Sequence, residues 1–415
     1  MKTGKNRKAI TAGILAAAAL LVLLYICIGT DLIGRNKTGE NVTLTLNELS
    51  EYTVVYPEQD DNAKLLAHWL ANKISEELGV TLTVTNDAEE AGGREMLVGT
   101  TDRTDCTCTT QALEQGRYLI GADEAYICAR GADAVGDYYA VHDLMAALLE
   151  QGKEEYQAAI VSEVKEVPVS DTLKAMSFNI LYKIESEERC MSVLQTILKC
   201  LPDTVGFQEA TPEWMAILEE NLGGIYDHVG VGRDDGENKG EHAAIFYRKD
   251  RFELVETGTK WLSDTPDVVS KYEGGYHYRI FTYAILKEKQ SEKEMMVINT
   301  HLEDSSGKAR RKQVAVLMDF IGEHPDYPTV LTGDFNSKRS SAEHRAVTEI
   351  LADSFEIAQT KEDEHTLLTN GTVVDYAFVS PQSIEVLDYR VVLEKENGML
   401  PSDHAPVLIQ YSIKN

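Results

Sequence analysis

The sequence predicts an α/β protein, with a small α/β domain, a larger catalytic domain and an N-terminal transmembrane helix. Residues 46–168 alternate β-branched runs with apolar residues at helical spacing. From Thr172 onward, short apolar runs end repeatedly in Asn, Asp, Glu or His. The N-terminus carries an uncharged run from Ala9 to Ile28. At 415 residues the chain is long enough for two folded units.

The N-terminal run predicts a membrane anchor. Four basic residues between positions 2 and 8 precede Ala9–Ile28, whose twenty residues match a hydrocarbon core of about 30 Å. The basic flank should stay in the cytoplasm, which places everything after Asp31 outside. The alternative is a cleaved signal peptide, but Tyr25–Ile28 offers no small-residue cleavage site, and Ile26 does not suit a lipoprotein signal at Cys27. We therefore expect a single-pass cell-membrane protein with an extracytoplasmic catalytic domain.

Changes of composition divide the chain into four parts. The segment after the anchor is polar and contains glycine, which is typical of a tether, and Pro168 marks a second boundary. The predicted parts are a cytoplasmic stub and signal-anchor (1–30), a linker (31–45), a small α/β domain of unknown role (46–168) and the catalytic domain (169–415).

The small domain is predicted from alternating short runs. Its residues form no charged cluster and no motif, so we assign it no chemistry. The expected elements are strands at Tyr52–Tyr56, Thr81–Val84 and Met96–Val98, helices at Asn62–Leu78 and Tyr138–Leu149, and a hairpin joining Tyr118–Ile120 to Tyr126–Ala129.

Six cysteines are too few for a disulfide framework, and one of them lies in the predicted span. Cys190 and Cys200 are expected on one helix with their Cα atoms about 15 Å apart, too far for a disulfide. Either Cys106 or Cys108 could pair with Cys128, or these residues are buried thiols, and the second reading is favoured. No histidines stand at zinc-site spacing.

The net charge of the chain argues against non-specific binding to nucleic acid. The formal net charge is −28, and from Ser170 onward 26 Lys and Arg stand against 42 Asp and Glu, a net of −16. Because binding to a phosphate backbone needs clustered Lys and Arg, we expect no non-specific nucleic-acid binding. Catalysis on a phosphate stays open, since bound cations invert the local field. No protein partner can be inferred.

The larger domain carries a series of apolar strands that end in polar residues. These residues supply histidines, carboxylates and amides, without a Ser or Cys beside an evident base. Such a set suits hydrolysis by water with a hard divalent cation rather than a covalent serine mechanism. The segments are Met176–Ile180, Pro202–Glu209, Gly240–Tyr247, Val297–Leu302, Val330–Ser337, Val373–Tyr376 and Ser402–Val407.

Taken in order, these motifs resemble the endonuclease/exonuclease/phosphatase superfamily, which includes pancreatic deoxyribonuclease, apurinic endonucleases, neutral sphingomyelinases and inositol-polyphosphate 5-phosphatases. The resemblance covers Leu173 to Ile413, and Gly232–Lys249 together with Trp261–Pro266 looks like a bacterial branch of that family. It implies a four-layer α/β-sandwich of two packed mixed sheets flanked by helices. It also implies Mg²⁺, with Mn²⁺ as the alternative ion, and a phosphate-ester substrate.

The resemblance also implies which residues hold the metal. Glu209 would be the principal Mg²⁺ ligand. Asn179 would lie beside it and contact metal-bound water or phosphate, and Asp403 would lie near the metal. A hard divalent cation prefers such oxygen ligands.

Further residues would contact the substrate. Asp334 and Asn336 would position the attacking water and a non-bridging oxygen. Arg279 and Arg310 match positions where the family often has arginine; either could touch phosphate, and a structural salt bridge is the equal alternative.

Two histidines complete the implied site. His404, oriented by Asp375, would face the phosphate, and His301 would be the second histidine with Glu241 as its carboxylate partner. A carboxylate that holds the far ring nitrogen fixes the tautomer and raises imidazole basicity. Two such pairs could activate water and protonate the leaving oxygen. The sequence does not assign which histidine is the acid and which the base.

The expected function is that of an extracytoplasmic, Mg²⁺-dependent phosphodiesterase with histidine general acid/base catalysis. Nucleic acid, a phospholipid head group and small phosphorylated metabolites are the three substrate classes, and the first and third rank level. The alternative is a non-enzymatic surface module that binds an envelope ligand and keeps a relic catalytic domain.

Overall fold

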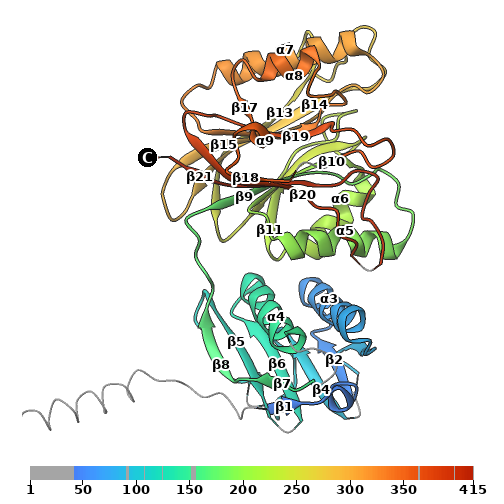
Figure 1. Ribbon diagram of the computed structural model, residues 1–415, viewed down its shortest axis with the longest axis vertical. Coiled ribbons are helices and arrows are strands. Elements are labelled where there is room, and N and C mark those ends of the chain that lie inside the picture. The colour runs from blue at the N-terminus through green and yellow to red at the C-terminus, as the bar shows by residue number, and fades with distance from the viewer. Residues whose placement is uncertain are drawn as a thin grey trace, which may run out of the picture.

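The chain folds into two α/β units joined by a short connection (Figure 1). The catalytic unit begins at Leu173, after a connection that follows Glu166. The structure is a computed structural model, and it describes residues 42–89, 93–106, 108–123, 125–150, 156–362, 365–396 and 398–414.

Within these ranges, no helix combines the length and the apolar character needed to cross a bilayer. The predicted span, residues 9–28, lies outside the described residues. The anchor therefore stays a prediction.

The small unit is built on a six-stranded mixed sheet in the order β3-β2-β4-β6-β5-β8 and a two-stranded sheet, β1-β7. Its strands are β1 (Val42–Leu44), β2 (Tyr52–Tyr56), β3 (Thr83–Asn86), β4 (Arg94–Val98), β5 (Arg117–Ala122), β6 (Tyr126–Gly131), β7 (Ala158–Ile160) and β8 (Glu163–Glu166). Its helices are α2 (Leu46–Leu49), α3 (Asp61–Leu78) and α4 (Ala134–Leu149).

The predicted α/β elements of this unit are present, and α4 differs most from its expected bounds. It begins four residues earlier than expected, because the side chain of Asp133 accepts a hydrogen bond from the Gly136 N–H and caps the helix. Gly136 also lies against β6, and a Cβ at this position would come within 2.8 Å of Gly131 Cα. A glycine at position 136 is thus required for the close packing of α4 on the sheet.

The catalytic unit contains two mixed sheets. The seven-stranded sheet has the order β11-β12-β10-β9-β21-β20-β18 and the six-stranded sheet the order β13-β14-β15-β16-β19-β17. The strands are β9 (Leu173–Asn179), β10 (Thr204–Ala210), β11 (Tyr226–Val229), β12 (His242–Arg248), β13 (Phe252–Trp261), β14 (Ile280–Glu288), β15 (Glu294–His301), β16 (Thr329–Asp334), β17 (Ala352–Asp353), β18 (Thr360–Lys361), β19 (Asp375–Val379), β20 (Ile384–Val391) and β21 (Val407–Ile413). The helices are α5 (Glu187–Cys200), α6 (Pro212–Leu222), α7 (Gly307–Gly322), α8 (Ala342–Val347) and α9 (Ser354–Ile357).

Helices flank both sheets. In Figure 1, α5 and α6 lie on the outer side of the seven-stranded sheet, and α7 and α8 lie on the outer side of the six-stranded sheet. One apolar core fills the space between the sheets, with Ala175, Ile245 and Val297 among its members. The predicted α/β architecture of packed mixed sheets flanked by helices is confirmed.

A buried polar network also joins the two sheets. The Asn299 amide on β15 donates to the backbone carbonyls of Phe207 (2.7 Å) and Ala244 (3.0 Å) on the opposite sheet. Its Oδ1 accepts from Gln208 Nε2 at 2.7 Å. Gly206 permits this approach, because a Cβ there would lie 2.2 Å from Thr332 Oγ1. These bonds fix the two sheets in register, so that their ends coincide.

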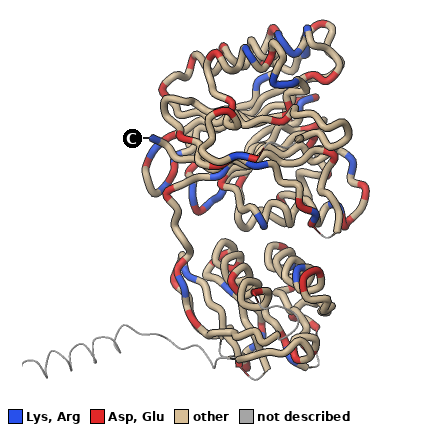
Figure 2. The backbone as a smooth tube through the Cα atoms, in the orientation of Figure 1, with Lys and Arg blue, Asp and Glu red and all other residues tan. Residues whose placement is uncertain are grey.

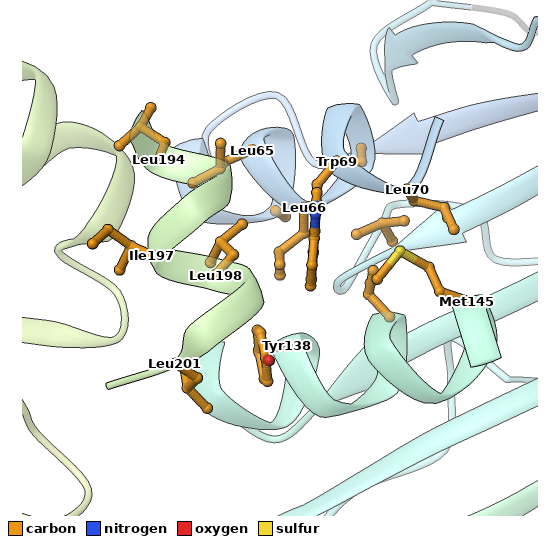
Figure 3. Packing of buried hydrophobic residues seen from close by; sticks show 14 of the residues in the cluster. Leu65, Leu66, Trp69, Leu70, Tyr138, Met145, Leu194, Ile197, Leu198 and Leu201 are labelled. Atoms are coloured by element: carbon orange, nitrogen blue, oxygen red, sulfur yellow. The ribbon is translucent and has the colours of Figure 1, made fainter. Parts of the chain in front are cut away.

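The small unit packs its helices against the catalytic unit. Trp69 on α3 stacks on Tyr138 of α4, with ring centroids 5.8 Å apart. Figure 3 shows Leu65 and Leu66 of α3 close to Leu198 of α5, in one continuous apolar cluster. The two units therefore share a core.

Candidate active site

The predicted catalytic residues meet at one edge of the two sheets because of strand direction. Asn179 ends β9, and His301 and Asp334 end the parallel strands β15 and β16, in register with each other. Asp375 begins β19, antiparallel to β16, and is in register with Asp334. His404 lies just before β21, antiparallel to β9. Segments far apart in the sequence thus deliver their polar ends to one place.

Asn179 lies between two carboxylates. Its Nδ2 donates to Glu209 Oε1 and to Asp334 Oδ2, both at 3.1 Å, and its Oδ1 accepts from the Leu181 N–H at 3.0 Å. Glu209 Oε2 accepts from the Tyr182 N–H at 2.9 Å. Asn179 is fully buried, so these bonds hold the two carboxylates in a fixed relation.

Two of these polar residues adopt left-handed backbone conformations. Glu209 has φ 61° and lies where the pairing of β10 with β12 shifts between Phe207 and Ala210. Asn336 has φ 46°, and its N–H donates to Asp334 Oδ1 at 2.8 Å. Bulges and left-handed residues re-aim side chains at a cost in backbone energy, and they concentrate at functional sites.

His404 forms a close pair with a carboxylate. Its Nδ1 lies 2.9 Å from Asp375 Oδ2 and 4.0 Å from Asp334 Oδ2. Burial opposes charge on this ring, but the carboxylates of Asp375 and Asp334 outweigh it and raise the pKa of His404 to about 10. In the metal-free protein this histidine is therefore a cation oriented by Asp375.

His301 lies in a different environment. Its Nε2 is 3.1 Å from Asn336 Nδ2 and 3.5 Å from Asp334 Oδ2. Its Nδ1 is 3.8 Å from Glu241 Oε2, too far for a hydrogen bond. Burial, together with the positive charges of Arg279 and other nearby groups, holds the pKa of His301 well below its usual value. This histidine is therefore neutral and can accept a proton.

Arg233 explains why Glu241 does not bind His301 directly. Its guanidinium makes a two-pronged ion pair with Glu241, at 2.6 Å and 2.9 Å. Glu241 thus lies beside His301, as predicted, but its hydrogen bonds go to arginine. Sequence reasoning missed Arg233. The available signal was its place in the loop of Gly232, eight residues before a carboxylate already singled out.

The two predicted phosphate-binding arginines differ. Arg279 is 4% exposed and lines a small pocket with Arg233, Glu241 and His301, and its Nε and Nη1 have no hydrogen-bond partner within the described residues. Arg310 Nη1 instead donates to two backbone carbonyls of the loop after β15, each at 2.9 Å. The contacts of Arg310 therefore favour the structural alternative over phosphate binding.

The remaining predicted ligand, Asp403, lies next to His404, and the Ser402 hydroxyl approaches its Oδ1 at 3.4 Å. Ligand atoms of Asp334, Asp375 and His404 lie within 4.8 Å of one another. Burial and the Asp375 carboxylate raise the pKa of Asp334 to about 7. Asn179 joins the Glu209 carboxylate to that of Asp334 by hydrogen bonds, so carboxylate and amide groups of the kind that bind a hard divalent cation lie together. The residues present therefore fit the implied metal.

Comparison with known proteins places this geometry in a family. The Endonuclease/Exonuclease/phosphatase family model matches residues 176–404, which is more than half of the chain. An endonuclease/exonuclease/phosphatase of Bacteroides vulgatus is 31% identical, with a TM-score of 0.56, and the match covers 59% of this chain and 99% of that structure. The mannosyl-6-phosphatase of Bacteroides thetaiotaomicron is 31% identical, with a TM-score of 0.54 and coverages of 58% and 100%.

A curated viral protein is also similar. The uncharacterized protein L388 of Acanthamoeba polyphaga mimivirus is 27% identical over 258 residues, which is 56% of this chain and 93% of that protein. On the family match, the chain belongs to the endonuclease/exonuclease/phosphatase family and is a phosphoester hydrolase of the phosphatase or nuclease type.

Proposed function

We propose that the catalytic unit is a Mg²⁺-dependent phosphoesterase that acts on small phosphorylated molecules, with a sugar phosphate as the first candidate. The observation that carries the hydrolytic part of this proposal is the pair of differently tuned histidines, His404 and His301, on either side of Asp334. Water attack on a phosphate needs one group to take a proton and another to supply charge or a proton. A neutral and a charged imidazole meet both needs.

Each residue has a role in this proposal. Glu209, Asn179 and Asp403 would hold the cation, which when bound would offset the negative charge of the phosphate. His301, neutral at physiological pH, would accept the proton of the attacking water. His404, kept charged and oriented by Asp375, would donate to a phosphate oxygen.

Three observations support a small substrate. Arg279 is buried and offers unused donors beside His301, which suits the extra charge of a terminal phosphate. Figure 2 shows Lys and Arg interspersed with Asp and Glu over the molecule rather than gathered in a stripe, as a long polyanion would need. The similarity to a mannosyl-6-phosphatase favours a sugar monoester.

A phosphodiester is the second candidate function, and it was the sequence-based prediction. It is favoured by the presence of two histidines, because a diester's leaving oxygen needs its own proton donor. Mannose 6-phosphate, p-nitrophenyl phosphate, bis-p-nitrophenyl phosphate and a single-stranded oligonucleotide would be compared with Mg²⁺, Mn²⁺ or EDTA. Faster hydrolysis of the monoesters supports the proposal, whereas faster hydrolysis of the aryl diester supports the alternative.

The matched variants are Glu209→Ala and Glu253→Ala, the latter an exposed carboxylate on β13. We expect Glu209→Ala to abolish metal-dependent hydrolysis and Glu253→Ala to leave it unchanged. Hydrolysis that survives EDTA and Glu209→Ala would contradict the metal-dependent mechanism. No hydrolysis of any substrate with either metal would favour the non-enzymatic surface module.

We also propose that the N-terminal run anchors the chain in the cell membrane with both units outside. This rests on the uncharged residues Ala9–Ile28 and the basic flank before them. Protease added to intact cells should digest both units, and carbonate washing should leave the chain in the membrane fraction. Protection from protease would contradict the proposed orientation.

A further inference from the structure

The small unit presents two different faces of its six-stranded sheet. Met96 and Ile127 point into the core shared with α3 and α4. Their neighbours Leu97 and Cys128, in register with each other, belong to a separate apolar cluster on the opposite face. The residue paired with Cys128 on β5 is Gly121, which contributes no side chain there. This second face is covered by residues from the connection between β4 and β5.

Three thiols meet on this covered face. Cys106 and Cys108 come from the connection, and Cys128 comes from β6. All three are buried, and their sulfur atoms lie within 4.8 Å of one another. The Cys106 and Cys128 sulfurs are 3.0 Å apart. The buried-thiol reading of the sequence is confirmed, and the structure adds that the three sulfurs form one cluster.

The surroundings act on the thiols in opposite directions: the neighbouring sulfurs and burial raise the pKa of Cys128, whereas hydrogen bonds lower the pKa of Cys106. The backbone N–H groups of Cys108 and Thr109 hydrogen-bond the Cys106 sulfur. Arg130, only 5% exposed, donates to the Cys108 carbonyl at 2.8 Å and interacts electrostatically with all three cysteines. N–H···S bonds and a buried cation are the outer contacts that metal–thiolate sites use to orient and charge-balance their ligands.

The connection that carries two of the thiols is itself held in place. Arg103 Nε donates to Glu95 at 2.7 Å, and the Tyr126 hydroxyl donates to Asp105 at 2.7 Å. The Thr109 hydroxyl donates to the Cys106 carbonyl at 2.8 Å. The three sulfurs are therefore brought together by a folded scaffold rather than by chance contact of mobile side chains.

We propose that Cys106, Cys108 and Cys128 form a binding site for one soft monovalent metal ion, Cu(I), in the small unit. Three S–H bonds break and three Cu–S bonds form, three protons leave to solvent, and copper stays in the +1 state. The product carries a net charge of −2, which Arg130 partly offsets. The site does not depend on the hydrolase activity of the other unit.

The ligand set selects the ion. Among the described residues, this group contains three sulfurs and neither a histidine nor a carboxylate. Structural zinc sites use four protein ligands in a tetrahedron, and here the apolar neighbours Val55, Leu97 and Leu119 provide no fourth. Soft thiolates favour Cu(I), which is satisfied by three of them.

The test uses the full chain, purified in mild detergent, reduced and kept under anaerobic conditions. It is titrated with Cu(I) held by the chromophoric chelator bicinchoninate. We expect one Cu(I) per chain to be withdrawn from the chelator. Cys106→Ser and Cys128→Ser should each weaken binding by at least about 100-fold. Cys190→Ser, which removes a buried thiol on α5, should bind as the natural chain does.

A second readout needs no variant to fold. After Cu(I) is added to the natural chain, alkylation followed by peptide mass spectrometry should show Cys106, Cys108 and Cys128 protected together. Failure to withdraw Cu(I), or protection that does not include these three residues, would overturn the proposal. Zn(II) bound as tightly as Cu(I) would overturn the choice of ion. A Cys106–Cys128 disulfide that forms when the reduced chain is exposed to dioxygen, which is reduced to hydrogen peroxide, and that then excludes Cu(I) would assign the cluster to redox chemistry.

Discussion

The two histidines of the active site stand in opposite electrostatic environments, although each has a carboxylate beside it. His404 is 2.9 Å from Asp375, and His301 is 3.8 Å from Glu241. The carboxylates around His404 outweigh burial and raise its pKa, whereas burial and neighbouring positive charge lower the pKa of His301. A carboxylate near a histidine therefore does not by itself determine the charge of the ring.

The difference comes from what else each carboxylate binds. Asp375 Oδ2 lies against the His404 ring, but both oxygens of Glu241 accept from Arg233. Arg279 adds a second positive charge beside His301. Like charges nearby disfavour the imidazolium ion, so the arginines convert one of two similar pairs into a proton acceptor.

The largest expected effect follows from removing each histidine. His404→Asn should lower kcat by about 10³-fold and His301→Asn by about 10²-fold, because the first loses an oriented cation and the second a neutral base. The measurement is kcat on the best phosphate ester, with His142→Asn, an exposed histidine of the small unit, as the control. Equal losses would mean that the two environments do not separate two roles.

Removing the carboxylate beside each histidine should lower kcat less than removing the histidine does, and the two variants should differ. Asp375→Asn breaks the 2.9 Å contact and should lower kcat by about 100-fold, as loss of a partner that orients a histidine does. Glu241→Gln should cost only about tenfold, because Glu241 makes no hydrogen bond to His301. Both are measured with saturating Mg²⁺. A larger loss of kcat for Glu241→Gln than for Asp375→Asn would contradict this prediction.

The contrast between the two histidines also shows which parts of the site could be predicted from the sequence. The pairing of Asp375 with His404 was predicted from the family resemblance, and strand direction brings the start of β19 and the residues before β21 to one edge. Arg233 could not be predicted, because it reaches Glu241 through a loop whose path is set by backbone bonds such as Gly232 N–H to the Glu237 carbonyl. Local periodicity contains no information on such a path.

In the fold, too, some features could be predicted from the sequence and others could not. The hairpin of β5 and β6 was predictable from two alternating runs around a turn. The three-cysteine cluster was not, since it depends on which face of the sheet the connection after β4 covers. Likewise, the first turn of α4 contains Gly136, which lowers helix propensity, and its close approach to Gly131 on β6 is a tertiary contact that local periodicity does not show.

Removing Arg233 should raise the pKa of His301 and so make its charge state more like that of His404. In Arg233→Met, Glu241 loses its two-pronged partner and can turn to His301, so the pKa of His301 should rise toward its usual value. Histidine side-chain NMR of the metal-free protein would measure this, and kcat should fall by a few-fold. The pKa of His404 should not change. An unaltered pKa of His301 would show that burial and Arg279, rather than Arg233, keep that ring neutral.

The last expected effect is on the pH dependence of stability, and its sign follows from the raised pKa of His404. A histidine whose pKa is raised by folding contributes stability that is fully present below its unfolded pKa of about 6.5 and is lost as the pH rises through about 10. In EDTA, the unfolding free energy of the natural chain should therefore fall relative to that of His404→Asn between pH 7 and 10, by about 3.5 kcal/mol. Urea unfolding at intervals of one pH unit measures the difference, in which the titrations of groups remote from His404 cancel. A constant difference over this range would mean that His404 is neutral in the folded protein, and the two histidines would then differ in position but not in charge.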